Sequence, residues 1–257
     1  MKINTIICGD AEKILKEIPE RSIHLIITSL PYNVGMPYQN YNDRQDLDKY
    51  MAKMRNIFTE CYRILVKGGR ICVNLPSAAQ QSSYSRVSWL AIDYIVMLRK
   101  IGFLDREMIA WIKSEHLSVR GKSTSWGSWM SASCPYLRDI HEWIIVMHKE
   151  TKVLEGKQSD ITREEFLEWT HNVWRILPNT AMRRFHPAPF PIELPTRLVK
   201  LYSFVGQTVL DPFCGIGTTC IAAKRHNRNY IGIDISPEYC NRAKLLLGQN
   251  FLYKEEV

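Results

Sequence analysis

The sequence predicts a doubly wound α/β fold, in which a mostly parallel sheet carries helices on both faces. Short apolar runs rich in β-branched residues alternate with amphipathic, helix-like segments, which is the pattern of βαβ units. One such run leads through a glycine-containing turn into a helix, within residues 208–225. The length of 257 residues is sufficient for one large α/β domain, or for one domain with an inserted subdomain.

The predicted strands and helices alternate along most of the chain. Strands are expected at Thr5–Cys8, Ile23–Ile27, Arg70–Leu75, Met108–Ile112, Trp143–Met147, Thr208–Leu210 and Tyr230–Ile233. Helices are expected at Asp10–Ile18, Leu47–Leu65, Trp89–Lys100, Ile161–Trp169, Pro195–Tyr202 and Thr218–Arg225. Pro19 ends the first helix and the run Lys67-Gly68-Gly69 ends the second, because proline and glycine are helix terminators.

The composition is that of an ordinary globular protein with an excess of basic residues. Apolar residues make up 46% and charged residues 23% of the chain. The formal net charge of +8 suits a polyanionic partner such as nucleic acid.

Signals for export, membrane insertion and metal binding are not found in the sequence. The N-terminus shows no signal segment, and no 18-residue apolar run is present. Seven cysteines without a CxxC pair are expected to be reduced, mostly buried thiols in the cytoplasm. The histidines lack metal-ligand spacing, so no metal is expected.

Two segments interrupt the alternation of strands and helices. Residues 113–139 are rich in serine, glycine, basic residues and tryptophan, which suits contact with a nucleic-acid strand and equally suits a loop whose tryptophans pack on the core. Lys113, Arg120, Lys122, Trp126 and Arg138 are the candidate DNA-binding residues there. Residues 150–180 are interpreted as an insertion between sheet elements that reads the target.

The strongest local signal is the order strand, glycine turn, helix, strand and acid in residues 208–234. Gly215 and Gly217 lie in the turn, and Asp234 ends the next strand, where a carboxylate can bind ribose hydroxyls. Position 220 is cysteine instead of the third glycine of a dinucleotide site, and position 218 is threonine instead of a P-loop lysine. The pattern therefore indicates an adenosine cofactor without pyrophosphate, which S-adenosylmethionine satisfies.

A second signal is the polar end of the predicted strand Ile23–Ile27, in the sequence ITSLPYN. Ligands of open α/β sheets bind beyond the carboxyl ends of such strands, so Ser29 to Asn33 are candidates for a site. A strand-ending turn without function is the alternative.

Taken as a set, these motifs resemble those of DNA amino methyltransferases. DPFCGIGTT (211–219) resembles their methionine-binding motif, and SLPY (29–32) resembles their catalytic S-P-P-Y or D-P-P-Y motif. The catalytic motif comes first and the cofactor motif last, as in the circularly permuted β-class. Further matches are CGD (8–10), GGRICVNLP (68–76), LRDIHEWIIVMHK (137–149) and HPAPFPIELPTRLV (186–199), so that the resemblance covers most of the chain outside 150–180.

The resemblance implies a role for each matched residue. The Ser29 hydroxyl and the Leu30 carbonyl would accept hydrogen bonds from the target amine, with Pro31 shaping the motif and Tyr32 stacking on a flipped base. The family has proline where this chain has Leu30, but Pro31 still favours an extended backbone at Leu30. The implied cofactor-binding residues are Asp10, His186, Pro187, Asp211, Phe213, Cys214, Gly215, Gly217, Thr218 and Asp234. A purely structural histidine is the alternative for His186.

The resemblance also implies a domain plan and partners. Residues 1–149 would form the catalytic half, 150–180 the target-recognition insertion and 181–257 the cofactor-binding half of one methyltransferase domain. Expected partners are duplex DNA, a cognate restriction endonuclease that activity does not require, and a second copy of the chain, all in a prokaryotic cytoplasm, with no membrane partner.

Several functions remain open at this point. Serine instead of aspartate at position 29 favours the N4 of cytosine as the methylated atom, and the N6 of adenine is the close alternative. An RNA or protein-glutamine methyltransferase uses related motifs, but the permuted order and the basic charge favour DNA. A DNA-binding module without enzymatic activity would leave the cofactor turn without a purpose.

Overall fold

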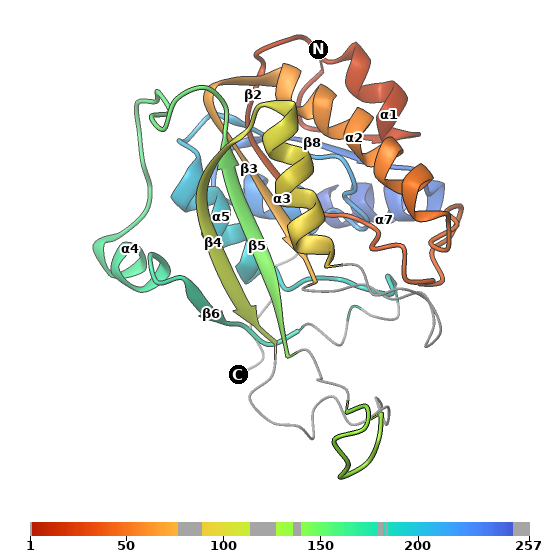
Figure 1. Ribbon diagram of the computed structural model, residues 1–257. Helices are drawn as coiled ribbons and strands as arrows, with labels where there is room; N and C mark the ends of the chain where they lie inside the picture. The colour runs from red at the N-terminus through yellow and green to blue at the C-terminus, as the bar shows by residue number, and fades with distance from the viewer. Residues whose placement is uncertain are drawn as a thin grey trace.

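The computed structural model describes residues 2–76, 89–113, 127–135, 140–178, 182 and 185–248, and these form one eight-stranded sheet with helices on both faces (Figure 1). The strands are β1 (Thr5–Cys8), β2 (Ile23–Ser29), β3 (Leu65–Leu75), β4 (Leu104–Ile112), β5 (His141–His148), β6 (Val173–Arg175), β7 (Thr208–Asp211) and β8 (Asn229–Asp234). The helices are α1 (Ala11–Ile14), the 3-10 helix η1 (Leu15–Glu17), α2 (Leu47–Ile64), α3 (Leu90–Ile101), α4 (Arg163–Trp169), α5 (Glu193–Tyr202), α6 (Thr218–Arg225) and α7 (Pro237–Gly248).

The sheet is mostly parallel, which confirms the predicted fold class. Its strand order is β1-β8-β7-β2-β3-β5-β4-β6. Within this sheet, β5 runs against its neighbours β3 and β4. The chain from β4 to β5 reverses direction without a crossover helix among its described residues, so β5 enters the sheet antiparallel between two strands that point the same way.

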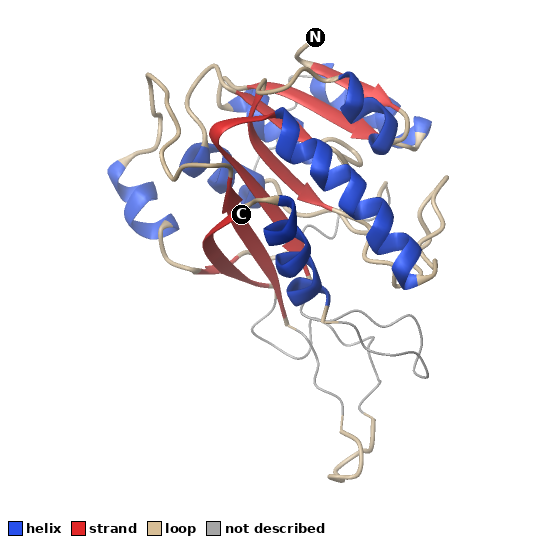
Figure 2. Cartoon of the chain, turned by 45° about the horizontal axis from the view of Figure 1, so that its top comes forward, coloured by secondary structure: helices blue, strands red, loops and turns tan. Residues whose placement is uncertain are grey.

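Two apolar cores cover the two faces of the sheet, as Figure 2 shows by the placement of the helices. One core joins α1, η1, α2 and α3 to the sheet, and the other joins α5, α6 and α7 to the opposite face. Strands such as β2 contribute to both cores, with Ile26 packing on one side and Leu25 on the other. Burial on both faces explains why these strands are continuous apolar runs.

The strand β3 begins earlier than the sequence predicts. It starts at Leu65, directly after α2 ends at Ile64, so Lys67-Gly68-Gly69 lies inside the strand and does not terminate the helix. Gly68 has a φ of +74°, and its N–H donates to the Lys149 carbonyl at 2.9 Å. A Cβ on Gly68 would lie 2.0 Å from the Val153 carbonyl oxygen. The glycine therefore serves the close crossing of another chain segment.

The predicted insertion, residues 150–180, is described over 150–178, and this part contributes the strand β6 to the same sheet. The strand β6 pairs in parallel with β4 at the sheet edge, and Trp174 on β6 is 1% exposed. The segment before β6 is also anchored to the opposite end of the sheet order, because Asp160 forms an ion pair at 2.7 Å with Arg228, which directly precedes β8. This region is thus continuous with the rest of the domain, and α4 stands away from the sheet (Figure 1).

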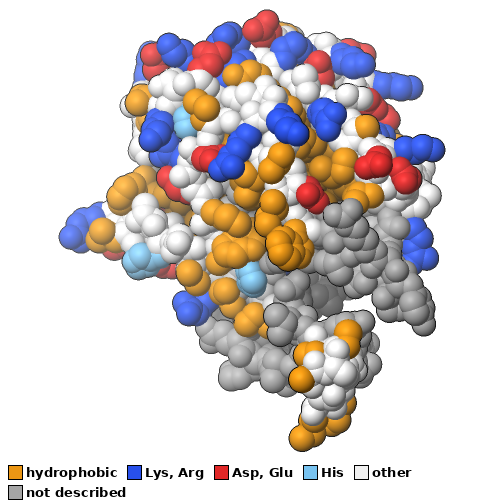
Figure 3. Space-filling model, viewed as in Figure 1, with side chains coloured by type: hydrophobic (Ala, Val, Ile, Leu, Met, Phe, Trp, Pro, Cys, Tyr) orange, Lys and Arg blue, Asp and Glu red, His pale blue; other side chains and the backbone are white. Residues whose placement is uncertain are grey.

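The surface carries an apolar area over the two long helices of one face. Figure 3 shows apolar side chains gathered near the position of α3 in the same view as Figure 1. Trp89, Ile92 and Val96 are exposed there and line a groove with Leu47 and Met51 of the α2 region.

Most of the cysteines are buried free thiols, as the sequence predicts. Five of the seven cysteines are buried, whereas Cys8 and Cys134 are exposed. Among the described residues, no helix combines the length and the apolar character needed to cross a membrane.

Candidate active site

The carboxyl ends of the parallel strands bring the predicted site residues to one edge of the sheet. Asp10 follows β1, Asp234 ends β8, Asp211 ends β7 and Ser29 ends β2. The sheet order places β8, β7 and β2 next to one another. Residues separated by about 200 positions in sequence therefore face a common space, as expected for an open α/β sheet.

The turn between β7 and α6 is shaped by glycines with left-handed backbone geometry. Gly215 has a φ of +51° and Gly217 a φ of +85°, a region that residues with a Cβ rarely occupy. A Cβ on Gly217 would lie 2.9 Å from the Cβ of Ala243, and one on Gly215 would lie 3.0 Å from Nε2 of His186. The glycines thus allow α6 to start close to α7 and keep the space beside His186 open.

Asp211 holds this turn from inside the protein. Its carboxylate accepts hydrogen bonds from the Thr28 hydroxyl at 2.9 Å, the Thr219 hydroxyl at 2.7 Å and the Phe213 N–H at 3.1 Å. Burial raises the pKa of Asp211 to about 6, against the lowering effect of these donors. Asp211 is 1% exposed, so it shapes the turn and does not line the pocket.

Asp234 lies at the pocket and anchors two backbone segments. Its Oδ2 accepts the Gly215 N–H at 2.8 Å and its Oδ1 accepts the Ser236 N–H at 2.8 Å. Burial raises the pKa of this carboxyl above its usual value, while the two N–H donors oppose the rise. Each carboxylate oxygen has further lone pairs, so Asp234 can hold the turn and still accept from a ligand hydroxyl.

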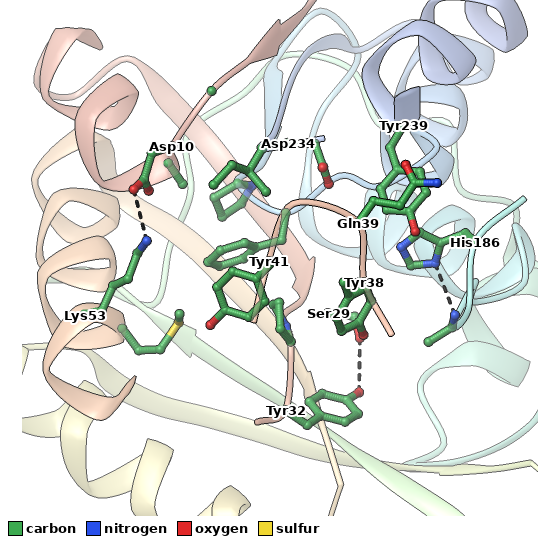
Figure 4. Close-up of a pocket in the computed structure, with 18 residues that line it drawn as sticks. Asp10, Ser29, Tyr32, Tyr38, Gln39, Tyr41, Lys53, His186, Asp234 and Tyr239 are labelled. Atoms are coloured by element: carbon green, nitrogen blue, oxygen red, sulfur yellow. Dashed lines mark hydrogen bonds and ion pairs between the residues drawn. The ribbon is translucent and has the colours of Figure 1, made fainter. Parts of the chain in front are cut away.

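A pocket opens between these strand ends, and Figure 4 shows its lining. Of the predicted site residues, Asp10, Ser29, Pro31, Tyr32, His186, Phe213 and Asp234 line it. Leu30, Pro187, Asp211, Cys214, Gly215, Gly217 and Thr218 lie outside this lining. Leu30 is buried in the core below the motif at 1% exposure, and Cys214 is buried under the turn. The lining also includes residues not predicted from the sequence, namely Tyr38, Gln39, Tyr41, Lys53, Met54, Pro212 and Tyr239.

The segment after the SLPY motif folds back over the pocket. The Asp43 carboxylate accepts the N–H groups of Asn33 at 2.8 Å, Val34 at 3.1 Å and Met36 at 2.9 Å. These bonds close the segment into a compact loop that presents Tyr38 and Tyr41 to the pocket. Two aromatic rings beside Asp234 provide an apolar surface that a nucleoside base can contact.

His186 lies at the other side of the pocket, with its ring packed against Tyr239 and Tyr38. Its Nδ1 accepts the Ala188 N–H at 3.2 Å. Burial lowers the pKa of His186 to about 4, so the ring is neutral at pH 7 and carries its proton on Nε2. His186 therefore presents an N–H donor near Gly215.

On the side of β2, the SLPY motif belongs to a buried polar cluster. The Ser29 Oγ lies 3.1 Å from the Tyr32 hydroxyl, which in turn lies 3.2 Å from Oε2 of Glu142. The Asn74 Nδ2 lies 2.9 Å from the Tyr32 hydroxyl and 2.6 Å from Oε2 of Glu142. Burial and the nearby Glu142 raise the pKa of Tyr32 well above its usual value, so this hydroxyl keeps its proton.

The register of the sheet explains why these residues meet. Asn74 on β3 lies beside Ser29 on β2, and Ile144 on β5 lies beside Asn74 on the other side. Glu142 is two residues from Ile144, so it points to the same face of the sheet. Glu142 also forms an ion pair with Lys113, which follows β4. Four strand ends thus contribute to one cluster.

Lys113 is therefore engaged inside the protein, although the sequence predicts a contact with DNA phosphate. Its side chain is 15% exposed and its ammonium lies 4.6 Å from the centre of the Trp111 ring. The other predicted DNA-binding residues, Arg120, Lys122, Trp126 and Arg138, lie outside the described residues.

Comparisons with known proteins agree with this geometry. A family model described as DNA methylase, covering N6 and N4 methyltransferases, matches residues 23–245. The chain belongs to this DNA methylase family.

Individual relatives support this assignment. The type II methyltransferase M.MjaVI of Methanocaldococcus jannaschii is 36% identical over 174 residues, which is 67% of this chain and 86% of the relative. The solved structure of TTHA0409 from Thermus thermophilus, complexed with S-adenosyl-L-methionine, is 30% identical with a TM-score of 0.75, covering 95% of this chain and 93% of that one. The PvuII DNA methyltransferase, described as cytosine-N4-specific, has a TM-score of 0.74 at 21% identity, covers 97% of this chain and 88% of that one, and shows the shared fold.

Sequence reasoning about this methylase missed Asn74, Glu142 and the tyrosines of the 33–46 loop. Asn74 and Glu142 are single polar residues within apolar strands, RICVNL and HEWIIVMH. A polar side chain at the carboxyl end of a central strand is a usable signal, because that edge carries the ligands. The position of Glu142 gives no such signal, since it lies at the amino end of its strand and reaches the site only because β5 is antiparallel.

Proposed function

We propose that this DNA methylase transfers a methyl group from S-adenosylmethionine to the N4 amine of cytosine in a specific sequence of duplex DNA. The observation that carries the choice of base is Ser29. A hydroxyl, and not a carboxylate, ends β2 beside the pocket and lies 3.1 Å from the Tyr32 hydroxyl. The order of the motifs, catalytic first and cofactor last, supports membership of the circularly permuted β-class.

S-adenosylmethionine occupies the pocket between β1, β8 and β7. Asp234 binds the ribose hydroxyls, Tyr38 and Tyr41 contact the adenine, and the neutral His186 donates from Nε2 on the side of the glycine turn. Gly215, Gly217, Asp211 and Thr218 act by shaping the turn, and Phe213 borders the pocket. The lining fits a nucleoside, because it combines aromatic surface with a few fixed polar groups.

The target cytosine leaves the duplex and enters beside Ser29 and Tyr32. Base flipping costs roughly a few kcal/mol, and contacts in the pocket offset it. The Ser29 hydroxyl and the Leu30 carbonyl accept hydrogen bonds from the amine, which favours the pyramidal nitrogen that forms during attack on the methyl group. The methyl group moves directly, without a covalent enzyme intermediate.

DNA is held by basic and aromatic residues of the segment 113–139. Arg120, Lys122, Trp126 and Arg138 contact the backbone and bases, and residues 150–180 read the target sequence from the sheet edge near β6. The protein acts in restriction and modification in a prokaryotic cytoplasm, beside a cognate endonuclease, and it forms homodimers.

Product analysis tests the proposal. Purified protein, S-adenosylmethionine and duplex DNA are expected to yield N4-methylcytosine on nucleoside analysis. Ser29→Ala is expected to lower the single-turnover rate by about 100-fold while changing cofactor and DNA affinity by less than about threefold, because the lost contact forms mainly in the transition state. N6-methyladenine as the product would transfer the same mechanism to adenine, and full activity of Ser29→Ala would remove the catalytic assignment.

A further inference from the structure

The hydrogen bonds in the polar cluster beside Ser29 have a defined donor and acceptor at each step. The Glu142 carboxylate, paired with the Lys113 ammonium, has acceptor sites and no proton to give. The Tyr32 hydroxyl lies 3.2 Å from Oε2 of Glu142 and 3.5 Å from the Asn74 carbonyl oxygen, and it donates to Glu142 because the carboxylate is the nearer and the charged acceptor. The Ser29 hydroxyl, 3.1 Å from the Tyr32 oxygen, can then donate only toward Tyr32 if the chain is to be satisfied.

Asn74 reinforces this direction. Its Nδ2 is a donor and lies 2.6 Å from Oε2 of Glu142 and 2.9 Å from the Tyr32 oxygen. An amide N–H facing the Tyr32 oxygen prevents the tyrosine proton from pointing back along that line. The Asn74 Nδ2 also lies 3.4 Å from the Ser29 Oγ, but its two hydrogens face the shorter contacts to Glu142 and Tyr32. With its own proton committed to Tyr32, the Ser29 oxygen keeps a lone pair for a donor in the pocket.

Glu142 is a buried carboxylate in an otherwise apolar stretch of β5. Glu142 is 8% exposed, and a buried ion pair seldom adds net stability, because desolvating both charges offsets their attraction. Within the same strand, the neighbouring buried positions are apolar, including Ile144, Val146 and Met147. A carboxylate kept at this place, in hydrogen-bond contact with the catalytic motif, fits a role in the reaction better than a role in packing.

We propose that Glu142 is a positioning residue for methyl transfer and the final acceptor of the proton that the target amine releases. The inference rests on the proposed function, since it needs an amine beside Ser29. Glu142 acts through Tyr32 and Ser29 and does not touch the base. The hydrogen-bond chain from Ser29 through Tyr32 to Glu142 fixes Ser29 as an acceptor before the reaction begins.

Methyl transfer to the amine releases one proton, which the hydrogen-bonded residues Ser29, Tyr32 and Glu142 carry away. The amine nitrogen forms a bond to the methyl carbon as the sulfur–methyl bond breaks, and the electron pair of that bond stays on sulfur. The nitrogen, now positively charged, gives one proton to the Ser29 oxygen while Ser29 passes its proton to Tyr32 and Tyr32 passes its own to Glu142. The products are the methylated neutral amine, S-adenosylhomocysteine and a protonated Glu142, which later releases the proton to solvent.

In this hydrogen-bond chain the Tyr32 hydroxyl transfers a proton, whereas stacking on the base requires only the ring. A tyrosine that only stacks uses its ring, so Tyr32→Phe would then keep the wild-type rate. A tyrosine that also relays the proton loses its function with the hydroxyl. Tyr32→Phe therefore separates the two roles without removing the ring.

The experiment compares single-turnover methylation by the full-length protein and its variants at saturating DNA and S-adenosylmethionine. Glu142→Gln and Tyr32→Phe are each expected to lower the rate by about 100-fold, with both affinities within about threefold of wild type. In Glu142→Gln the amide can donate to the Tyr32 oxygen. This reverses the direction of the hydrogen bonds, so that the Ser29 proton points at the amine. The double variant is expected to lose no more than either single variant, because the two residues act as one unit.

The matched controls are Glu107→Gln and Tyr202→Phe. The Tyr202 hydroxyl donates to the Glu107 carboxylate at the other end of β4, so these variants remove the same kind of bond away from the pocket. Their rates are expected to stay within about twofold of wild type. Glu142→Asp, which keeps the carboxylate, is expected to recover part of the rate lost in Glu142→Gln.

The outcomes separate this inference from the proposed function. Wild-type rates in Tyr32→Phe or in Glu142→Gln, while Ser29→Ala is inactive, would overturn the chain and leave the methyltransferase assignment standing. Failure of the wild-type protein to methylate DNA, or full activity of Ser29→Ala, would overturn the proposed function itself. If Glu142→Gln does not fold, Tyr32→Phe alone decides, because its ring keeps the packing of the native side chain.

Discussion

The two sides of the pocket are built by different physical means. One side, which we propose for the cofactor and call the cofactor side, consists of one contiguous stretch, β7–turn–α6–β8. Glycines and backbone N–H groups set its geometry, and Asp234 ties the turn to the end of β8. The other side, which we propose for the target base and call the base side, consists of side chains from four strand ends, joined by hydrogen bonds among Ser29, Tyr32, Asn74 and Glu142 and by the ion pair to Lys113.

Because they are built differently, the two sides are sensitive to different kinds of substitution. Backbone geometry tolerates changes of polarity but not the addition of a Cβ at a position with positive φ. A buried polar network tolerates changes of side-chain shape poorly. It tolerates the exchange of a hydrogen-bond acceptor for a donor worst, because the direction of each hydrogen bond depends on the others. Steric substitutions should therefore damage the cofactor side, and isosteric polar substitutions should damage the base side.

The largest expected effect is that of Gly215→Val on cofactor binding. The valine would be strained at a φ of +51°, and its Cβ would meet Nε2 of His186 at 3.0 Å. S-adenosylmethionine affinity measured by titration calorimetry is expected to fall at least about 100-fold. Gly206→Val is the matched control, since Gly206 also has a positive φ of +81° but no atom within 4 Å of its Cβ position. Equal S-adenosylmethionine affinity in the two variants would show that the contact between the added Cβ at position 215 and His186 does not determine cofactor binding.

The same difference explains how much of the site the sequence could predict. Gly215, Gly217 and Asp234 lie within about 20 residues of chain, and their order of strand, turn, helix and strand carries the geometry by itself. Glu142 and Lys113 reach Ser29 only through the pairing of β3, β5 and β4. No local pattern encodes that register, so the base side was predicted only in its SLPY motif.

The fold shows the same limit. The alternation of apolar runs and helices predicts the class, because both faces of each central strand are buried. The start of β3 at Leu65 was not predictable from Lys67-Gly68-Gly69, since the glycines serve a tertiary crossing by the Val153 segment and not a helix end. The strand β6 was missed as a strand, because it has only three residues and depends on β4 for pairing.

A second prediction concerns Asp211, the buried support of the glycine turn. Its pKa of about 6 in the folded protein lies above the ordinary value of 3.8, so the native state holds the proton more tightly than the unfolded state. The unfolding free energy from this group is therefore largest at low pH and falls by about 2 kcal/mol between about pH 4.5 and 7. Urea unfolding of Asp211→Asn should lack this fall, because the amide does not titrate.

The control for this measurement is Asp105→Asn at an exposed ion pair. The Arg99 guanidinium lowers the pKa of Asp105, so its contribution is present above the unfolded pKa and is lost as the pH falls. The pH effect of Asp105→Asn is thus opposite in sign, and it is small because the pair is exposed to solvent. Parallel pH curves for wild type and Asp211→Asn would contradict the role given to Asp211.

The smallest expected effect is that of Asp234→Ala, and it tests whether one side chain on the cofactor side is both scaffold and ligand. The carboxylate holds the Gly215 and Ser236 N–H groups at 2.8 Å each. Ser236 is 0% exposed and Gly215 is also buried, so removal of the carboxylate leaves both N–H groups without their acceptor. Loss of the ribose contact alone weakens binding by about tenfold, the scale of one charge-assisted hydrogen bond. Calorimetry should show this tenfold loss for S-adenosylmethionine with DNA affinity unchanged, while a lower urea-unfolding midpoint reports the two buried N–H groups left without an acceptor. Asp234→Asn should fall between alanine and wild type, because its Oδ1 keeps one acceptor while its Nδ2 faces an N–H donor. Unchanged affinity in Asp234→Ala would leave the carboxylate as scaffold only, and the ribose would then have to be held by backbone groups of the turn.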